Sequence, residues 1–134
     1  MWLISGGAFQ GKLDYALDIT GMNREDAADG LTCSRQELLG KPIINHFHLW
    51  IERMLREGQD VNALVEEILE VNPKAVIIVD ELGCGIVPME PSVREYRETT
   101  GRICCRLAAA AQEVHRVICG IGTVIKVEKN KINQ

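Results

Sequence analysis

The segment Trp2-Leu3-Ile4-Ser5-Gly6-Gly7-Ala8-Phe9-Gln10-Gly11-Lys12-Leu13 decides how the rest of the chain can fold. It begins with an apolar run long enough for one buried strand, passes through a glycine pair, and ends in residues that can wind into a helix. A strand, a glycine-rich loop and a helix in this order are the outline of a phosphate-binding loop. We therefore expect this segment to cradle phosphate groups.

The spacing of the glycines matches a known phosphate-binding pattern. Gly6, Gly11 and Lys12 satisfy the pattern Gly-x-x-x-x-Gly-Lys, in which glycines let backbone N–H groups approach phosphate oxygens and the lysine supplies a positive charge. The alternative is a structural turn with a solvated lysine. The candidate nucleotide-binding residues are Gly6, Gly7, Ala8, Gly11, Lys12 and Leu13.

Leu13 departs from the motif at a specific point. The next position after the lysine normally carries a Ser or Thr hydroxyl that binds Mg²⁺, and leucine has no oxygen to offer. Phosphate binding survives that loss better than catalysis does. GTP or ATP is thus the expected ligand, Mg²⁺ is possible although its usual protein ligand is missing, and no set of metal ligands can be assigned.

Length and composition narrow the class of protein. The 134 residues are expected to form one domain spanning 1–134, with 46% apolar and 25% charged residues, as in ordinary globular proteins. A net charge of −4 argues against nucleic acid or a membrane surface as partner. The sequence contains no apolar run of membrane-spanning length, no secretory leader and no Cys-x-x-Cys pair, so we expect a cytoplasmic protein with reduced thiols.

Hydrophobic periodicity predicts alternating strands and helices. Ala75–Val79 is a continuous β-branched run typical of a strand buried on both faces. The pattern indicates an α/β fold with a mainly parallel sheet in three layers. Further strands are expected at Leu31–Cys33, Pro42–Phe47, Val114–Cys119 and Val124–Ile125, and helices at Lys12–Ile19, Ser34–Gly40, Leu49–Leu55, Asp60–Asn72 and Ser92–Gln112. Residues 21–30 are expected to form a loop or a poorly formed turn of helix, and 83–88 a loop.

Three helix starts carry capping signals. Ser34 and Ser92 each precede a glutamate by three positions, which predicts capping boxes, and Asp60 precedes an amphipathic stretch. These signals place the start of each helix.

Ligands of parallel sheets bind beyond the carboxyl ends of the strands. That edge is expected to collect four segments: 6–12, 45–48, 80–85 and 120–122. Asp80 and Glu81 follow the strongest predicted strand and are candidate catalytic carboxylates that orient a hydroxyl or hold Mg²⁺, alongside Lys12; the alternative is a solvated pair. If the chain stays extended there, His46 and His48 would face one side and could bind a metal or accept a nucleotidyl group. The alternative is a structural role, because two histidines alone make an incomplete zinc site.

Several motifs together resemble one enzyme family. Glu81-Leu82-Gly83-Cys84-Gly85-Ile86-Val87-Pro88, Gly101-Arg102, Arg106–Ala111 and Gly120-Ile121-Gly122 are similar to the C-terminal half of the bifunctional adenosylcobinamide kinase/adenosylcobinamide-phosphate guanylyltransferase family. Gly6-Gly7-Ala8 with Gly11-Lys12 resembles that family's phosphate loop. The resemblance covers most of residues 1–20 and nearly all of 42–126.

The resemblance implies a P-loop NTPase-like fold and two reactions. One phosphorylates the aminopropanol hydroxyl of cobinamide with a nucleoside triphosphate, and the other transfers GMP from GTP through a phosphohistidine-type intermediate. The histidine-bearing segment of the family is contracted here to residues 21–40, which hold no histidine, and Asn45 replaces the family's acidic residue. The kinase activity is therefore the one that the resemblance favours, with adenosylcobinamide as substrate.

Two alternatives remain open. The chain is either a cobinamide kinase-like phosphotransferase or a catalytically degenerate relative that binds nucleotide or corrinoid. A structural homo-oligomer that has lost the site is a further possibility, because members of the family assemble through their helices.

Overall fold

The computed structural model describes residues 1–82 and 90–128. A six-stranded sheet lies at its centre, in the order β2-β3-β4-β1-β5-β6. The first five strands run parallel and β6 pairs antiparallel with β5 at one edge. The strands are β1 (Trp2–Gly6), β2 (Ala27–Asp29), β3 (Ile43–Asn45), β4 (Val76–Asp80), β5 (Glu113–Ile118) and β6 (Ile121–Val127).

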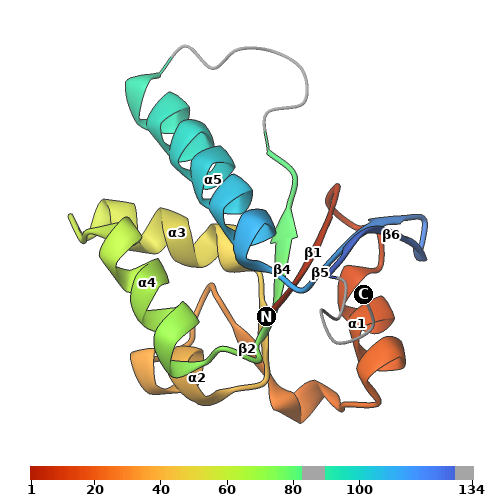
Figure 1. The fold of residues 1–134 in the computed structure, drawn as a ribbon. Helices are drawn as coiled ribbons and strands as arrows, with labels where there is room; N and C mark the ends of the chain where they lie inside the picture. Colours follow the sequence, from red (N-terminus) through yellow and green to blue (C-terminus); the bar gives the residue numbers. More distant parts are fainter. Residues whose placement is uncertain (83–89, 129–134) are drawn as a thin grey trace.

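Helices cover both faces of this sheet (Figure 1). One apolar cluster joins the sheet to α3, α4 and α5, and a second joins its other face to α1. The predicted three-layer α/β fold with a mainly parallel sheet is confirmed. The helices are α1 (Lys12–Thr20), α2 (Arg35–Gly40), α3 (Phe47–Arg56), α4 (Val61–Val71) and α5 (Pro91–Ala110), with a short 3₁₀ helix at Arg24–Asp26.

β4 forms the middle of the core, as its composition predicts. Its residues Val76 to Val79 are all at most 4% exposed, and it pairs with β3 on one side and β1 on the other. Branched side chains on both faces suit a strand between two helical layers. The strand ends in Asp80, which therefore emerges at the edge where ligands of such sheets bind.

Two of the predicted helix caps are present. The Ser34 hydroxyl accepts from the Glu37 N–H while the Glu37 carboxylate accepts from the Ser34 N–H, which completes a capping box at α2. The Asp60 carboxylate accepts from the Ala63 N–H at the start of α4. These bonds satisfy backbone donors that a helix leaves unpaired at its first turn.

The strand predicted at Leu31–Cys33 is wrong. The strand in this region is β2, and the residues after it form a turn. The Asp29 carboxylate accepts from the Leu31 N–H, and the Asp29 carbonyl accepts from the N–H groups of Thr32 and Cys33. This aspartate-stabilised turn outweighs the β propensity of Leu31 and Thr32.

The capping box predicted at Ser92 is also wrong. Helix α5 begins at Pro91 with Glu90 as its N-cap, so Ser92 lies inside the first turn. A proline suits the first helical position because its missing N–H would have no partner there. All of the glycine-rich loop predicted at 83–88 lies outside the described residues.

Two further findings concern the described residues taken together. Within residues 1–82 and 90–128, no helix has both the length and the apolar character of a membrane span. Cys33, Cys104, Cys105 and Cys119 are free thiols. Of the adjacent helical pair, Cys104 packs against the core and Cys105 is exposed, which confirms that only one of two neighbours faces inward.

Candidate functional site

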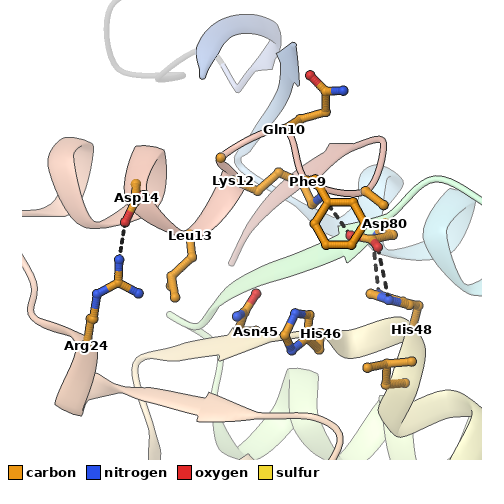
Figure 2. A pocket seen from close by; sticks show the side chains of 13 residues that line it. Phe9, Gln10, Lys12, Leu13, Asp14, Arg24, Asn45, His46, His48 and Asp80 are labelled. Atoms are coloured by element: carbon orange, nitrogen blue, oxygen red, sulfur yellow. Dashed lines mark hydrogen bonds and ion pairs between the residues drawn. The ribbon is translucent and has the colours of Figure 1, made fainter. Parts of the chain in front are cut away.

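A pocket of about 380 Å³ opens at the carboxyl edge of the sheet (Figure 2). It lies between the loop after β1, the start of α1, the end of β3, the start of α3 and the end of β4. Its lining residues are Ala8, Phe9, Gln10, Gly11, Lys12, Leu13, Asp14, Arg24, Asn45, His46, His48, Leu49 and Asp80. Three of the four segments expected at this edge therefore meet in one place.

The glycine loop presents the N-terminus of α1 to this pocket. Gly11 is the N-cap residue and has a φ of 81°, a left-handed conformation that glycine adopts without strain. The first bond within the helix runs from the Tyr15 N–H to the Gly11 carbonyl, and the N-cap glycine has no side chain to cap the preceding donors. Because these N–H groups and the helix dipole favour negative charge, this end of α1 suits a phosphate.

Lys12 is buried at the base of the pocket, with a 7% exposed side chain. Its ammonium donates to the Gly7 carbonyl at 2.6 Å and lies 2.7 Å from Oδ1 of Asp80. An ammonium has three donors, so one remains for a further acceptor. The lysine that sequence analysis placed in the phosphate loop is thus held by the loop itself and by the adjacent strand.

Asp80 contacts His48 as well as Lys12. The Asp80 N–H donates to Nδ1 of His48 at 3.1 Å, and Nε2 of His48 lies 3.3 Å from Oδ2 of Asp80. Because Nδ1 accepts a hydrogen bond, the proton of a neutral imidazole sits on Nε2 and faces the carboxylate. Burial lowers the pKa of His48, and this outweighs the opposite effect of Asp80.

His46 has a different partner and a different geometry from His48. It is the N-cap of α3 with a φ of 54°, and its Nδ1 lies 3.0 Å from Oδ1 of Asp29. The extended segment expected at 45–48 therefore ends at Asn45. The two rings stand edge to face with centroids 5.9 Å apart, but each pairs with its own carboxylate.

The donor set of the pocket fits phosphate better than a metal ion. Figure 2 shows Leu13 and Asn45 extending toward the same part of the pocket, and Leu13 stands where the motif would place a hydroxyl ligand. Leu13 offers none, and Asn45 offers one amide oxygen. Among residues 1–82 and 90–128, no group of three or more His, Cys, Asp or Glu side chains is placed to hold a metal. Any Mg²⁺ here would depend mainly on phosphate oxygens and water.

Glu81 and the predicted segment 120–122 lie beside the pocket and are not among its described lining residues. Glu81 turns to β5, where its carboxylate accepts from the Arg116 guanidinium at 2.8 and 3.1 Å. Gly120 donates its N–H to the Gln10 carbonyl at 2.7 Å, and the Cys119 N–H donates to Oε1 of Gln10. The β5–β6 turn therefore supports the glycine loop from outside.

Sequence reasoning named as site residues none of five that line this pocket, Phe9, Gln10, Asp14, Arg24 and Leu49. Asp14 and Arg24 form an ion pair at its wall, and no spacing rule links a helix start to a distant 3₁₀ helix. Phe9 is fully exposed at the rim with a φ of 58°. A bulky residue inside a glycine-rich loop is unusual, and this was the one sequence signal that pointed to Phe9.

Comparison with known proteins gives matches to one family. The family model described as cobinamide kinase / cobinamide phosphate guanyltransferase matches residues 23–125. The bifunctional adenosylcobalamin biosynthesis protein CobU of Salmonella typhimurium is 40% identical over 67 residues, which cover 50% of this chain and 37% of that protein. Its namesake from Escherichia coli is 39% identical over 67 residues, with the same coverage. The matched stretch thus spans little more than a third of either relative.

Proposed function

Because the chain belongs to the cobinamide kinase / cobinamide phosphate guanyltransferase family of cobalamin biosynthesis, we propose that its pocket binds the phosphates of GTP or ATP. Binding prepares transfer of one phosphoryl group to a hydroxyl of adenosylcobinamide. The observation that carries this proposal is the placement of Lys12, whose ammonium lies at an uncapped helix N-terminus between Gly7 and Asp80. The proposed reaction takes place in the cytoplasm.

The residues have separate roles in this proposal. The N–H groups at the start of α1 and the third donor of Lys12 bind phosphate oxygens. Positioning and charge neutralisation supply most of the catalysis in phosphoryl transfer, so a preorganised lysine matters more than covalent chemistry. Asp80 holds the Lys12 ammonium in place. The remaining lone pairs of the Asp80 carboxylate face the acceptor hydroxyl.

Isothermal titration calorimetry with GTP and with ATP tests the binding step. We expect binding by the full chain and a loss of at least about tenfold in Lys12→Met, since a charge-assisted hydrogen bond is worth about 1.5–3 kcal/mol. Lys74→Met is the matched control, because Lys74 is an exposed lysine that precedes β4 at the opposite edge of the sheet. Equal affinity of both variants would contradict the proposal.

A second candidate function is nucleotide or corrinoid binding without turnover. Leu13 and Asn45 favour it, since both stand where a kinase needs oxygen ligands for its metal. A kinase assay with adenosylcobinamide separates the two candidates. Phosphorylated product above background excludes the binding-only function, and nucleotide binding without product supports it.

Self-association is a separate proposal and rests on the sheet edge. The β5–β6 hairpin carries five exposed large apolar residues, Ile118, Ile121, Val124, Ile125 and Val127. Exposed apolar residues on an edge strand favour pairing with another chain. Light scattering after size-exclusion chromatography measures the mass, and a monomer at all concentrations would contradict a homo-oligomer.

A further inference from the structure

A second cleft, of about 310 Å³, lies between α5 and the ends of β1 and β4. Five helix residues follow one another along its outer wall at positions that share a face of α5: Thr100, Gly101, Cys104, Cys105 and Ala108. The strand side consists of Leu3, Ser5, Val79, Asp80, Glu81, Leu82 and Val114. Of these lining residues, only Asp80 also lines the proposed nucleotide pocket.

Asp80 lines both this cleft and the nucleotide pocket. Oδ1 of its carboxylate faces Lys12 and Oδ2 faces His48. A carboxylate has about four lone-pair positions, so these contacts leave room for another donor. A hydroxyl bound at the Asp80 end of the cleft would therefore lie beside the lysine that binds phosphate.

The buried hydroxyl of Thr100 is the second observation at this cleft. Thr100 is 2% exposed, and its Oγ1 has no hydrogen-bond partner within the described part of the chain. A helical threonine usually donates to a carbonyl one turn earlier, as Thr20 does to Ala16 at 2.7 Å. Leaving such a hydroxyl unpaired costs free energy, so a ligand that pairs with it gains affinity.

The charges of the lining limit the chemistry of the ligand. The cleft has two carboxylates, those of Asp80, which pairs with Lys12, and Glu81, which pairs with Arg116, and its described lining includes no lysine or arginine. An anion in the cleft would meet these carboxylates and no cationic side chain of the described lining, so anions are disfavoured. The same strand side also contributes the apolar side chains of Leu3, Val79 and Val114. The lining fits a neutral group that has an apolar body and a hydroxyl at one end.

We propose that this cleft binds the acceptor alcohol, a neutral alcohol with an apolar arm, and presents its hydroxyl at Asp80. The proposal rests on the proposed function. In the transfer, the alcohol oxygen forms a bond to the terminal phosphorus of the nucleoside triphosphate, and the bond from that phosphorus to the bridging oxygen breaks. The nucleoside diphosphate leaves, and the hydroxyl proton passes to Asp80.

Cyclohexanol is a suitable probe, because it is a neutral ring alcohol, and cyclohexanecarboxylate is its matched anion. Each is titrated into the ¹⁵N-labelled full chain while amide shifts of Ser5, Leu82 and Cys104 are followed by NMR. We expect saturable shifts with the alcohol and none with the anion. Unsaturable shifts with cyclohexanol, or equal binding of both probes, would overturn the proposal.

Gly101 provides a matched pair of variants at the rim of the cleft. It is exposed, and a Cβ added there meets nothing within 4 Å, so a larger side chain is tolerated by the fold. Gly101→Ala and Gly101→Leu both remove the helical glycine and differ in the volume they add. We expect Gly101→Ala to bind cyclohexanol like the parent and Gly101→Leu to bind at least about tenfold more weakly. Equal affinities would place the probe outside the cleft.

Thr100→Val tests the hydroxyl separately, since it keeps the side-chain shape and removes the unpaired oxygen. Its affinity for cyclohexanol should fall about three- to tenfold, the value of one hydrogen bond, while thermal unfolding shows it at least as stable as the parent. Unchanged affinity would remove Thr100 from the site. Calorimetry with GTP and ATP distinguishes the two proposals: nucleotide binding without cyclohexanol binding overturns only the cleft, and the reverse overturns only the nucleotide site.

Discussion

The imidazole of His48 contacts Asp80 through both of its nitrogens. Nδ1 accepts from the Asp80 backbone N–H at 3.1 Å, and Nε2 lies 3.3 Å from the Asp80 carboxylate. This pairing fixes one neutral tautomer and turns the other carboxylate oxygen toward Lys12. The carbonyl of His48 also accepts from the Tyr96 hydroxyl, which ties α3 to α5.

His48 makes the stability of the fold depend on pH. Burial lowers its pKa below the ordinary 6.5, so below pH 6.5 the unfolded chain binds more protons at this residue than the folded chain does. The contribution is present above pH 6.5 and is lost as the pH falls toward the lowered pKa. We expect urea unfolding at pH 8 and pH 5.5 to show a larger loss of stability in the parent than in His48→Gln. An equal loss would mean that His48 does not titrate differently on folding.

The ion pair between Lys12 and Asp80 should be measurable as a coupling. Removing one partner of a fully buried pair costs about 3–5 kcal/mol, and the 19% exposure of the Asp80 side chain lowers the expected cost of Asp80→Asn to about 2 kcal/mol. A double-mutant cycle with Lys12→Met isolates the pairwise part. Additive effects of the two substitutions on the free energy of unfolding would show that the contact is energetically silent.

Restoring oxygen ligands should restore a response to Mg²⁺. In Leu13→Ser with Asn45→Asp, a hydroxyl and a carboxylate stand where the motif expects them. We expect Mg²⁺ to strengthen GTP or ATP binding at least about tenfold more in this double variant than in the parent. Leu13→Ala with Asn45→Asp is the control, because it loses the same packing without gaining the hydroxyl. The same response in both variants would exclude a role for position 13 in metal binding.

Two glycines should respond oppositely to alanine. A Cβ on Gly30 would lie 2.2 Å from the His46 carbonyl oxygen, so Gly30→Ala is expected to cost about 1–3 kcal/mol. Gly40 lies in α2 with nothing within 4 Å of its added Cβ, and Gly40→Ala should stabilise by about 0.5–1 kcal/mol. Thermal unfolding measures both. A neutral Gly30→Ala would mean that the backbone between β2 and His46 shifts far enough to admit the added Cβ.

The free thiols should differ in reactivity. Burial raises the pKa of Cys104 to about 11, which leaves only about one part in a thousand as thiolate at pH 8, and Cys33 is buried. Cys105 and Cys119 are exposed. Brief alkylation with iodoacetamide followed by peptide mass spectrometry should label the exposed pair first. Labelling in urea, where all the thiols are accessible, provides the control.

Local signals predicted most of the fold. The β-branched run of β4 and the caps at Ser34 and Asp60 were sufficient because each depends on neighbours within a few positions. β2 was missed for the same reason. Its alanines have weak strand propensity, and they form a strand because β3 supplies the pairing partner.

The sequence predicted the glycine loop of the candidate site, but it did not predict which side chains contact one another there. Lys12 and Asp80 were named as candidates from a motif and from the end of a strand, and the structure places them 2.7 Å apart. Their link to His48 depends on a left-handed residue at His46 that turns the chain from strand to helix. Sequence gives little warning of such a residue, because a histidine there pays a steric cost that only the surrounding contacts offset.

The position of β1 between β4 and β5 has a consequence for how the chain acquires its structure. β1 pairs Leu3 with Ile77 and with Val114, more than 70 and 110 positions away. During translation this apolar strand is therefore synthesised long before either of its neighbours. Closing such long loops slows folding. Until then the strand that carries the glycine loop is exposed to chaperones and to aggregation.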